Sequence, residues 1–222
     1  MKTYRIGVIR VLTTDDPELL NRHGRLLERY FPMFETTSRC IPDQPEGIHD
    51  DETEARAVPK ILTLARQMSA EGFHALIISC AGDPAVEACR RELPIPVVGG
   101  GRSTAALAMF YGDRPAAVGI TAQIPRGYAA VFGARCVGSA RGKGVSSTMD
   151  LMRSGGRAAT AEAARMLKQR GADVLALSCT GTSTAGIAPQ LERELGIPVL
   201  DPVMSEGLIV LYELLRRQTA EG

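Results

Sequence analysis

Gly72-Phe-His-Ala-Leu-Ile-Ile-Ser-Cys80-Ala-Gly82 and Gly171-Ala-Asp-Val-Leu-Ala-Leu-Ser-Cys179-Thr-Gly181 are two copies of one pattern. Each copy continues to a Glu-Leu pair and then to Ile-Pro-Val, which begins at Ile95 and at Ile197. The two cysteines lie 99 residues apart and the two Ile-Pro-Val segments 102 apart, so the second copy holds three extra residues after its cysteine. A repeat of about half the chain length is far longer than a solenoid period and predicts one structural unit that occurs twice.

Each copy has the pattern of a buried strand that ends in Ser-Cys-x-Gly, followed by a loop, a helix and a second buried strand. Strands and helices alternate through the rest of the chain, whereas Gly138–Thr148 has no apolar period and is expected to be a mobile loop. This alternation predicts an α/β protein made of two pseudo-symmetric parallel-sheet units, Rossmann-like or flavodoxin-like. The expected strands are Tyr4–Ile9, Glu35–Cys40, His74–Ser79, Pro96–Val98, Ala116–Ile120, Ala134–Val137 and the second-copy counterparts of His74–Ser79 and Pro96–Val98.

The repeat also predicts where the chain divides. Ser103–Tyr111 follows the first copy just as Ser205–Arg217 follows the second, and both segments have helical patterns. We therefore expect one unit of residues 1–101 plus 205–222, with the terminal helix returning to it, and another of residues 102–204. Open α/β sheets bind ligands beyond the carboxyl ends of their strands. Since both repeated cysteines follow such strands, we expect the active site in the cleft between the units.

Composition narrows the class of partner. The 222 residues carry 26 basic and 25 acidic side chains without a block of one sign, so neither nucleic acid nor an anionic membrane is an expected partner. Residues 1–10 lack the apolar run of a signal peptide, and no apolar stretch reaches the length of a membrane span, so neither feature is expected. The five cysteines form no C-x-x-C pair, which favours free thiols and a cytoplasmic protein. We expect a small-molecule substrate, a homo-oligomer and no metal site; of the three histidines only His49, in a polar loop, is of interest.

The strongest chemical candidates are Cys80 and Cys179. A single cysteine is most often a small buried apolar residue, which is the expected role of Cys40, Cys89 and Cys136. Two cysteines at equivalent positions of a repeat favour chemistry instead. A free thiol has a pKa near ~8.5, and backbone N–H groups of the following loop and helix would stabilise its thiolate.

Other residues of the two loops have expected roles of their own. Asp83 is expected to cap a helix that begins at Pro84, with an influence on the thiol as the alternative. In the second copy a run of hydroxyl side chains could bind a polar substrate group; these are Thr180, Thr182, Ser183 and Thr184.

Two opposed thiols suit racemisation, in which a proton leaves one face of a carbon and another arrives on the opposite face. The carbanion or enolate between these steps requires hydrogen-bond donors at its carbonyl oxygen. No cofactor motif is visible and no cofactor is expected. Gly99-Gly-Gly101-Arg102 fails the dinucleotide pattern because Thr104 replaces the last glycine, so a crossover hinge or a small-anion nest is the preferred interpretation.

On four motifs the chain resembles the aspartate/glutamate/hydantoin racemase superfamily, most closely its hydantoin racemase branch. The motifs are Ser79-Cys80-Ala-Gly-Asp83-Pro84, Ile95-Pro-Val-Val-Gly99, Ser178-Cys179-Thr180-Gly181 and Ile197-Pro-Val-Leu-Asp201-Pro202. The resemblance covers nearly the whole chain and implies cofactor independence, with Cys80 and Cys179 as the two bases and substrate binding by the loops that follow them. The expected substrate-binding residues are Arg10, Ala81, Gly82, Asp83, Gly100, Thr121, Thr180, Gly181 and Thr182.

One departure from the family concerns the end of the first strand. Family members often have Asn-Pro-Asn-Thr there, whereas this chain has Arg10-Val11-Leu12-Thr13. A guanidinium pairs with a carboxylate through two parallel hydrogen bonds, so Arg10 favours an anionic substrate and is expected to line the cleft.

The expected function is a cofactor-independent racemase or epimerase acting on a carbon next to a carbonyl, in a 5-substituted hydantoin or an amino-acid-like substrate. An aspartate/glutamate-type amino-acid racemase is one alternative, and a lyase or cis-trans isomerase on the same scaffold, which can use a single thiol, is another. Alternatives of other classes are a non-catalytic small-molecule binding protein and a thiol redox protein; the 99-residue separation of the cysteines disfavours the latter.

Overall fold

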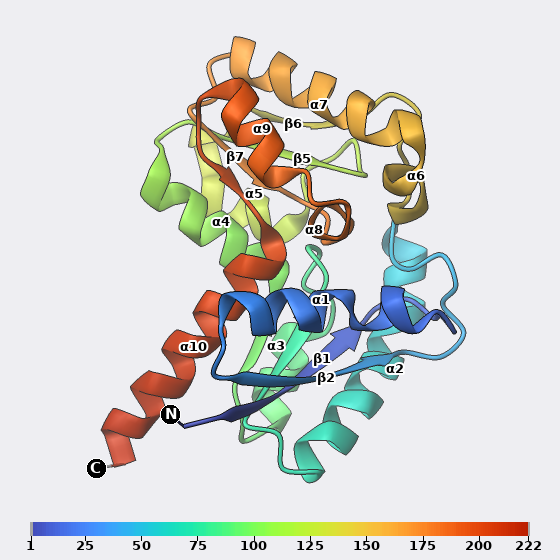
Figure 1. Cartoon of the computed structure of the whole chain (residues 1–222), viewed down its shortest axis with the longest axis vertical. Helices are drawn as coiled ribbons and strands as arrows, with labels where there is room; N and C mark the ends of the chain where they lie inside the picture. Colours follow the sequence, from blue (N-terminus) through green and yellow to red (C-terminus); the bar gives the residue numbers. More distant parts are fainter. Residues whose placement is uncertain (1, 222) are drawn as a thin grey trace. The chain divides into compact units, whose positions relative to one another are not determined.

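The computed structural model describes residues 2–221, without the side chains of Ser154, Ala220 and Glu221. The chain forms two compact units, residues 1–100 with 203–222 and residues 101–202 (Figure 1). Each unit contains a four-stranded parallel sheet, with strand order β2-β1-β3-β4 in the first and β6-β5-β7-β8 in the second. The two sheets have the same topology, because adding four to each strand number of the first order gives the second order. The predicted doubled α/β fold is therefore confirmed.

In the first unit, the sheet pairs in a register that aligns the carboxyl ends of β1 and β3: Arg10 lies opposite Ser79. On β4, Gly99 lies opposite Ile78 of β3. The loops after these strands therefore emerge at one edge. The strands are β1 (Tyr4–Arg10), β2 (Phe34–Cys40), β3 (Ala75–Ser79) and β4 (Val97–Gly99), and the helices are α1 (Pro17–Tyr30), α2 (Asp51–Ala70), α3 (Val86–Glu92) and α10 (Pro202–Glu221).

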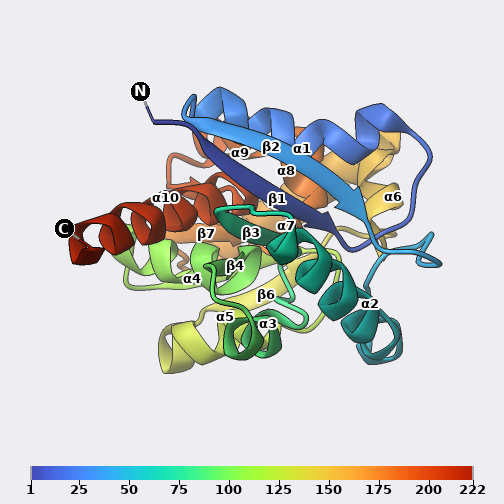
Figure 2. The ribbon, with the colours of Figure 1, turned by 90° about the horizontal axis from the view of Figure 1, so that it is seen from below.

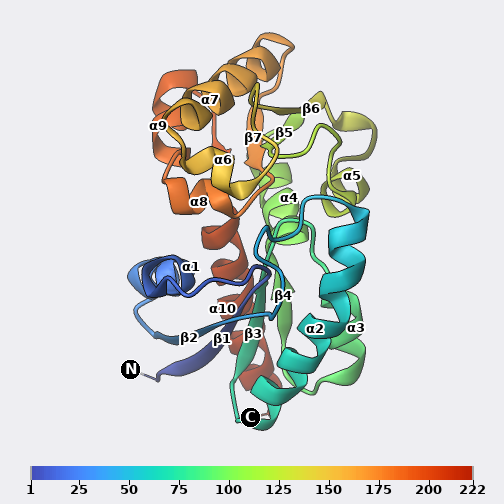
Figure 3. The same cartoon turned by 90° about the vertical axis from the view of Figure 1, so that its right-hand side faces the viewer.

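Helices cover both faces of the first sheet (Figures 2 and 3). On one face, Leu27 of α1 and Val210 of α10 pack with Ile6 and Ile77 of the strands. On the other face, α2 and α3 pack against a second core cluster, which includes Ile78. Because successive side chains of a strand point to opposite faces, Ser79 and Cys80 are directed to different sides of the sheet end.

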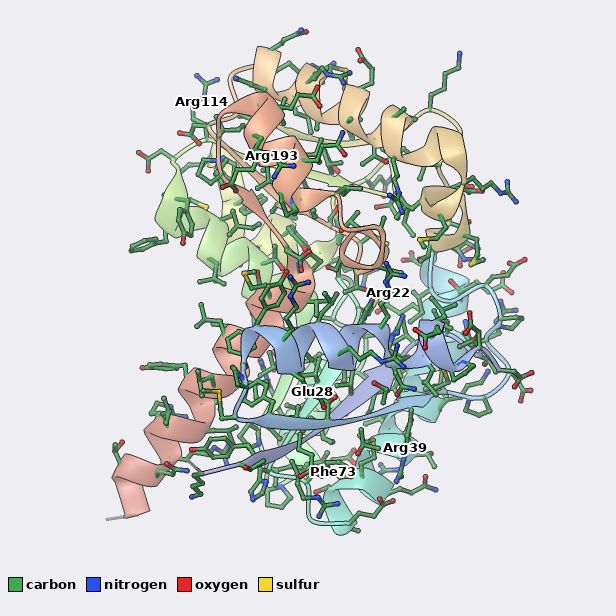
Figure 4. The ribbon with its side chains drawn as sticks, viewed as in Figure 1. Arg22, Glu28, Arg39, Phe73, Arg114 and Arg193 are labelled. Carbon is green, nitrogen blue, oxygen red and sulfur yellow. The ribbon has the colours of Figure 1, made fainter. Side chains whose placement is uncertain are left out.

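Local sequence signals explain where the first helices begin. The Asp16 side chain accepts a hydrogen bond from the N–H of Glu18, and Pro17 occupies the first helical position. Asp50 and Thr53 form a capping box at the start of α2. Helix α2 continues through Pro59, which lies inside it. Near α1, the N–H and hydroxyl of Thr36 both donate to Glu28, which Figure 4 shows between α1 and β2.

The second unit has the same layered build. Helices α7, α8 and α9 pack on one sheet face through Leu167, Ala185 and Leu191. Helices α4 and α5 cover the other face (Figure 3), and the hydroxyl of Tyr128 in α5 donates to the carbonyl of Leu177. The strands are β5 (Pro115–Gly119), β6 (Gly138–Arg141), β7 (Val174–Leu177) and β8 (Val199–Leu200), and the helices are α4 (Gly100–Tyr111), α5 (Arg126–Phe132), the short 3-10 turn η1 (Gly133–Arg135), α6 (Thr148–Met152), α7 (Ser154–Gln169), α8 (Gly181–Ala185) and α9 (Ala188–Leu195).

Two sequence predictions in this unit are wrong. Ala134–Val137 was expected to be a strand, but its first residues belong to the 3-10 turn η1. The strand β6 lies instead at Gly138–Arg141, in the segment expected to be a mobile loop. Strand β6 pairs only with β5 at the sheet edge, and only Ala140 of its four residues is buried. An edge strand with so little buried surface leaves no apolar run in the sequence to reveal it.

The glycine segment expected to be a crossover hinge or an anion nest is where the chain passes from one unit to the other. Gly99 ends β4 and Gly100 begins α4, so the strand passes directly into the helix. Within residues 2–221, none of the helices is long and apolar enough to cross a bilayer.

Candidate active site

Cys80 immediately follows β3 in the first unit. Its side chain is half-buried and packs against the core cluster on the α2 and α3 side of the sheet. The N–H of Gly82 points at the Cys80 sulfur at 3.5 Å, and the N–H of Cys80 itself donates to the Ile78 carbonyl at 2.8 Å. A backbone donor aimed at sulfur favours the thiolate, which is the form that accepts a proton.

The loop after Cys80 has a strained backbone. Asp83 and Ala85 both have left-handed φ angles, 56° and 59°, which residues with a Cβ rarely adopt. Helix α3 begins at Val86, and its N-cap, Ala85, makes no side-chain capping bond, so the prediction that Asp83 caps a helix at Pro84 is wrong. The Asp83 carboxylate instead packs over Gly99, where an added Cβ would lie 2.2 Å from its Oδ1. Strain of this kind often accompanies a functional loop.

Arg10 ends β1 and lies opposite Ser79, but on the α1 side of the sheet, whereas Cys80 packs on the α2 side. Its side chain is buried, and Nη1 donates to the carbonyls of Leu19 (2.6 Å) and Leu20 (3.0 Å) in α1. Burial lowers the pKa of the guanidinium to about 10, against the influence of Cys40 and Glu206. Arg10 therefore has an internal structural role, and its predicted contact with a substrate carboxylate stays a prediction.

Cys179 follows β7 in the second unit, at the position equivalent to Cys80. It is buried with Ile120, Val145 and Leu151. Burial raises the pKa of the Cys179 thiol, while the Thr148 hydroxyl and the N–H groups of Gly181 and Thr182 act in the opposite direction. In both units the N–H two residues after the cysteine thus interacts with its sulfur.

Thr148 is a contact that the sequence interpretation missed. Its Oγ1 lies 3.7 Å from the Cys179 sulfur, and either atom could donate. Thr148 is the first residue of α6, which Ser147 and Asp150 begin with a capping box. The Ser-x-x-Asp spacing of that box is a known helix-start signal. That signal could have shown that a helix begins at the end of the segment expected to be mobile.

The remaining predicted residues lie in the loops and first helical turns that follow the strands at the same ends of their sheets. Ala81, Gly82 and Asp83 follow Cys80, and Gly100 follows β4. In the second unit the Thr182 hydroxyl donates to the Cys179 carbonyl at 2.5 Å, which holds the turn that contains Thr180 and Gly181. Thr121 follows β5, and its hydroxyl donates to the Gln123 carbonyl. Each unit therefore gathers its own share of the predicted residues at one sheet edge.

Two further sequence expectations concern side chains outside these loops. His49 lies before α2 with its Nε2 3.6 Å from the Asp50 carboxylate. None of the five cysteines forms a disulfide, and Cys89 is a buried core residue whose pKa burial raises to about 11, which agrees with its expected structural role. Cys136 is half-buried, and burial also raises its pKa.

Fold and site together define the class: an enzyme of two α/β units, each with a thiol after the third strand of its own sheet. The family model for Asp/Glu/hydantoin racemase matches residues 21–205. The chain is 28% identical to a hydantoin racemase of Rhizobium meliloti over 179 residues, 75% of this chain and 73% of that protein. The chain belongs to the Asp/Glu/hydantoin racemase family, and as such it is an isomerase.

Solved structures share the fold. An allantoin racemase from Klebsiella pneumoniae superposes with a TM-score of 0.82 at 24% identity, over 97% of this chain and 89% of that one. Arylmalonate decarboxylase superposes with a TM-score of 0.64 at 15% identity, over 95% of this chain and 92% of that one. At these identities the likeness concerns the fold alone, so the reaction has to be argued from the residues of this chain.

Proposed function

We propose that this enzyme racemises cyclic ureides such as 5-substituted hydantoins without a cofactor, with Cys80 and Cys179 as its two acid–base groups. The observation that carries the proposal is the equivalence of the two thiols. Each follows the equivalent strand of its sheet, and each interacts with the backbone N–H two residues farther along. A reaction that needs one proton acceptor and one proton donor of the same kind accounts for this duplication.

The proposed reaction balances with the two thiols alone. The thiolate of one cysteine takes the hydrogen from C5 of the ring and becomes a thiol, and the electron pair of the C–H bond is delocalised onto the neighbouring carbonyl as an enolate. The thiol of the other cysteine then gives its proton to the opposite face of C5 and becomes a thiolate. The substrate is inverted and the two cysteines have exchanged protonation states, so the opposite enantiomer can react next.

The environment of the two thiols fits this division of roles. Burial raises the pKa of Cys179, which favours its protonated form and hence the donor role in the resting enzyme. Cys80 is half-buried and has the Gly82 N–H directed at its sulfur, which favours the acceptor role. The first turnover therefore starts with the enantiomer whose C5 hydrogen faces Cys80.

The substrate class follows from the side chains beside the thiols. Arg10, the one predicted partner for a carboxylate, is buried and bonded to α1 carbonyls. The loops after the cysteines carry hydroxyl side chains and one acid, Asp83, rather than lysine or arginine. Such loops suit an uncharged ring that presents amide N–H and C=O groups. The relatives named hydantoin racemase and allantoin racemase also support a cyclic ureide over an amino acid.

The test is hydrogen exchange in D2O, followed by NMR, with separate enantiomers of several 5-substituted hydantoins, of allantoin, and of aspartate and glutamate. The proposal predicts exchange at C5 and loss of optical rotation for at least one cyclic ureide, with neither aspartate nor glutamate exchanging. Exchange confined to the amino acids would move the enzyme to the amino-acid branch. Binding of a ureide without exchange of its C5 hydrogen would contradict racemisation.

We also propose that the enzyme is a homo-oligomer of the cytoplasm. Five cysteines without a disulfide suit a reducing compartment. Sedimentation equilibrium of the purified protein tests the oligomer: a mass of 23.7 kDa at all concentrations would contradict it.

A further inference from the structure

A group of buried polar side chains lies in the first unit, on the α1 and α10 side of the sheet end. It consists of Arg10 from β1, His23 from α1, Ser79 from β3 and Glu206 from α10, and we call it the Ser79 network. None of these side chains is more than 3% exposed. Ser79 is the residue before Cys80, so the network joins two helices and a neighbouring strand to the peptide that carries the thiol.

The hydrogen bonds of the network fix where its protons lie. The Ser79 hydroxyl donates to Glu206 Oε1 at 2.6 Å, and His23 Nδ1 lies 2.8 Å from the same Ser79 oxygen. A hydroxyl has one proton, and it is used on Glu206, so His23 must donate from Nδ1. A serine that donates to a carboxylate and accepts from an imidazole is held in one rotamer from two sides.

Arg10 adds a positive charge to the network. Its buried guanidinium is attracted to the Glu206 carboxylate. Arg10 also donates to the Leu19 carbonyl one helical turn before His23, so it fixes the part of α1 that presents the imidazole.

Glycines bring both helices close enough for these bonds. Gly24 follows His23, and a Cβ there would lie 2.5 Å from Thr36 Oγ1 on β2. Gly207 follows Glu206, and a Cβ there would lie 2.4 Å from Phe31 Cε2. His23 and Glu206 each precede a glycine that makes a close contact. Small packing changes at Gly24 or Gly207 will therefore move the network.

The second unit differs at the corresponding positions. Ser178 occupies the place of Ser79 before Cys179, and its buried hydroxyl makes no hydrogen bond. In the first sheet Arg10 lies opposite Ser79. At the equivalent place in the second sheet, Gly119 lies beside Ser178, and a Cβ added to Gly119 would be 2.4 Å from the Ser178 hydroxyl. By the 102-residue offset, the counterpart of Glu206 is Thr104. The duplicated fold is thus asymmetric directly behind its two thiols.

We propose that Ser79, His23 and Glu206 are positioning residues for Cys80. Proton transfer by Cys80 then depends on this buried network, whereas proton transfer by Cys179 does not. The proposal rests on the proposed racemase function. Holding Ser79 fixes the Ser79–Cys80 peptide and so the alignment of the Cys80 sulfur with the Gly82 N–H. None of the three residues touches the substrate; they act through the Cys80 backbone.

The test compares Ser79→Ala and Glu206→Gln with the matched control Ser178→Ala, which removes a hydroxyl that has no partner. The first readout needs no substrate: alkylation rates of Cys80 and Cys179 by iodoacetamide across a pH series, resolved by peptide mass spectrometry. Loss of one hydrogen bond predicts that Cys80 reacts about 5-fold more slowly at neutral pH in both network variants, with its profile moved to higher pH. Cys179 is expected to keep its wild-type profile.

The second readout is C5–H exchange of each enantiomer in D2O. A misplaced base predicts a loss of about 10–100-fold for the enantiomer that depends on Cys80, which Cys80→Ser identifies, and little change for the other. Ser178→Ala should change neither enantiomer. Glu206→Gln is nearly isosteric, so it tests the network even if Ser79→Ala fails to fold.

The outcomes separate this proposal from the proposed function. Equal slowing of both enantiomers and of both alkylation rates, no change in either, or the same effect from Ser178→Ala would overturn the positioning role. If the wild-type enzyme exchanges no substrate at all, the proposed function fails, while the alkylation profiles still decide whether the network positions Cys80.

Discussion

Gly207→Ala tests the packing that holds α10 on the first unit. The added methyl would lie 2.4 Å from Phe31 Cε2 and 2.6 Å from Leu27 Cδ2, at least ~1 Å inside ordinary contact distance. Leu27 is fully buried, so neither side chain can turn into solvent without opening the core. Overpacking of this kind costs about 1–3 kcal/mol, and displacement of two side chains places it in the upper half of that range.

A helical alanine also offers a gain, so the sign has to be worked out. Replacing glycine by alanine in a helix stabilises by about 1 kcal/mol. The net effect of Gly207→Ala is therefore a loss of about 1–2 kcal/mol in the free energy of unfolding, or roughly 2–8 °C in Tm for a chain of this length.

Gly155→Ala in α7 is the matched control, because no atom lies within 4 Å of its added Cβ. This variant should gain up to about 1 kcal/mol. Urea titration and calorimetry of both variants measure the difference. If Gly207→Ala is as stable as Gly155→Ala, the close approach of α10 to α1 at this glycine is refuted.

Two further substitutions address the candidate site. Thr148→Val removes the hydroxyl that lowers the pKa of Cys179, so the pKa of this buried thiol should rise further. Alkylation of Cys179 by iodoacetamide should then begin at a higher pH than in the wild type. An unchanged alkylation profile would mean that Thr148 does not bond to the sulfur. Arg10→Ala removes the donor to the Leu19 and Leu20 carbonyls of α1 and should cost about 1–3 kcal/mol of stability, measured by urea titration. If stability is retained and only the binding of carboxylate ligands is lost, Arg10 is a substrate-binding residue instead.

Sequence patterns were sufficient for the architecture because the repeat carries it. Strands β3 and β7 are continuous apolar runs, and such runs are typical of strands covered on both faces. Once those strands were aligned, the place of Cys80 and Cys179 at their carboxyl ends followed without knowledge of any contact. The cap at Asp16 was equally visible, since a capping bond joins residues two positions apart.

Features that depend on distant or weak contacts were not predictable. Glu206 meets Ser79 across 127 positions and His23 meets it across 56, so no local pattern relates the three. The sequence singles out His49, in a polar loop, whereas His23 is the histidine that bonds to Ser79 at the end of β3. Asp83 looked like a helix cap, but the left-handed backbone at Asp83 and Ala85 delays α3 to Val86. The Asp83 carboxylate packs over Gly99, a tertiary contact that no local pattern shows.

The most direct test of the two-thiol mechanism uses Cys80→Ser and Cys179→Ser with single enantiomers of a 5-substituted hydantoin in D2O. Serine is a far weaker base near neutral pH, so each variant should lose racemisation by about 10²–10⁴-fold. Each retains one competent thiol and should still exchange the C5 hydrogen of one enantiomer, the two variants preferring opposite hands. Full racemase activity in either variant, or exchange of the same enantiomer by both, would contradict the mechanism.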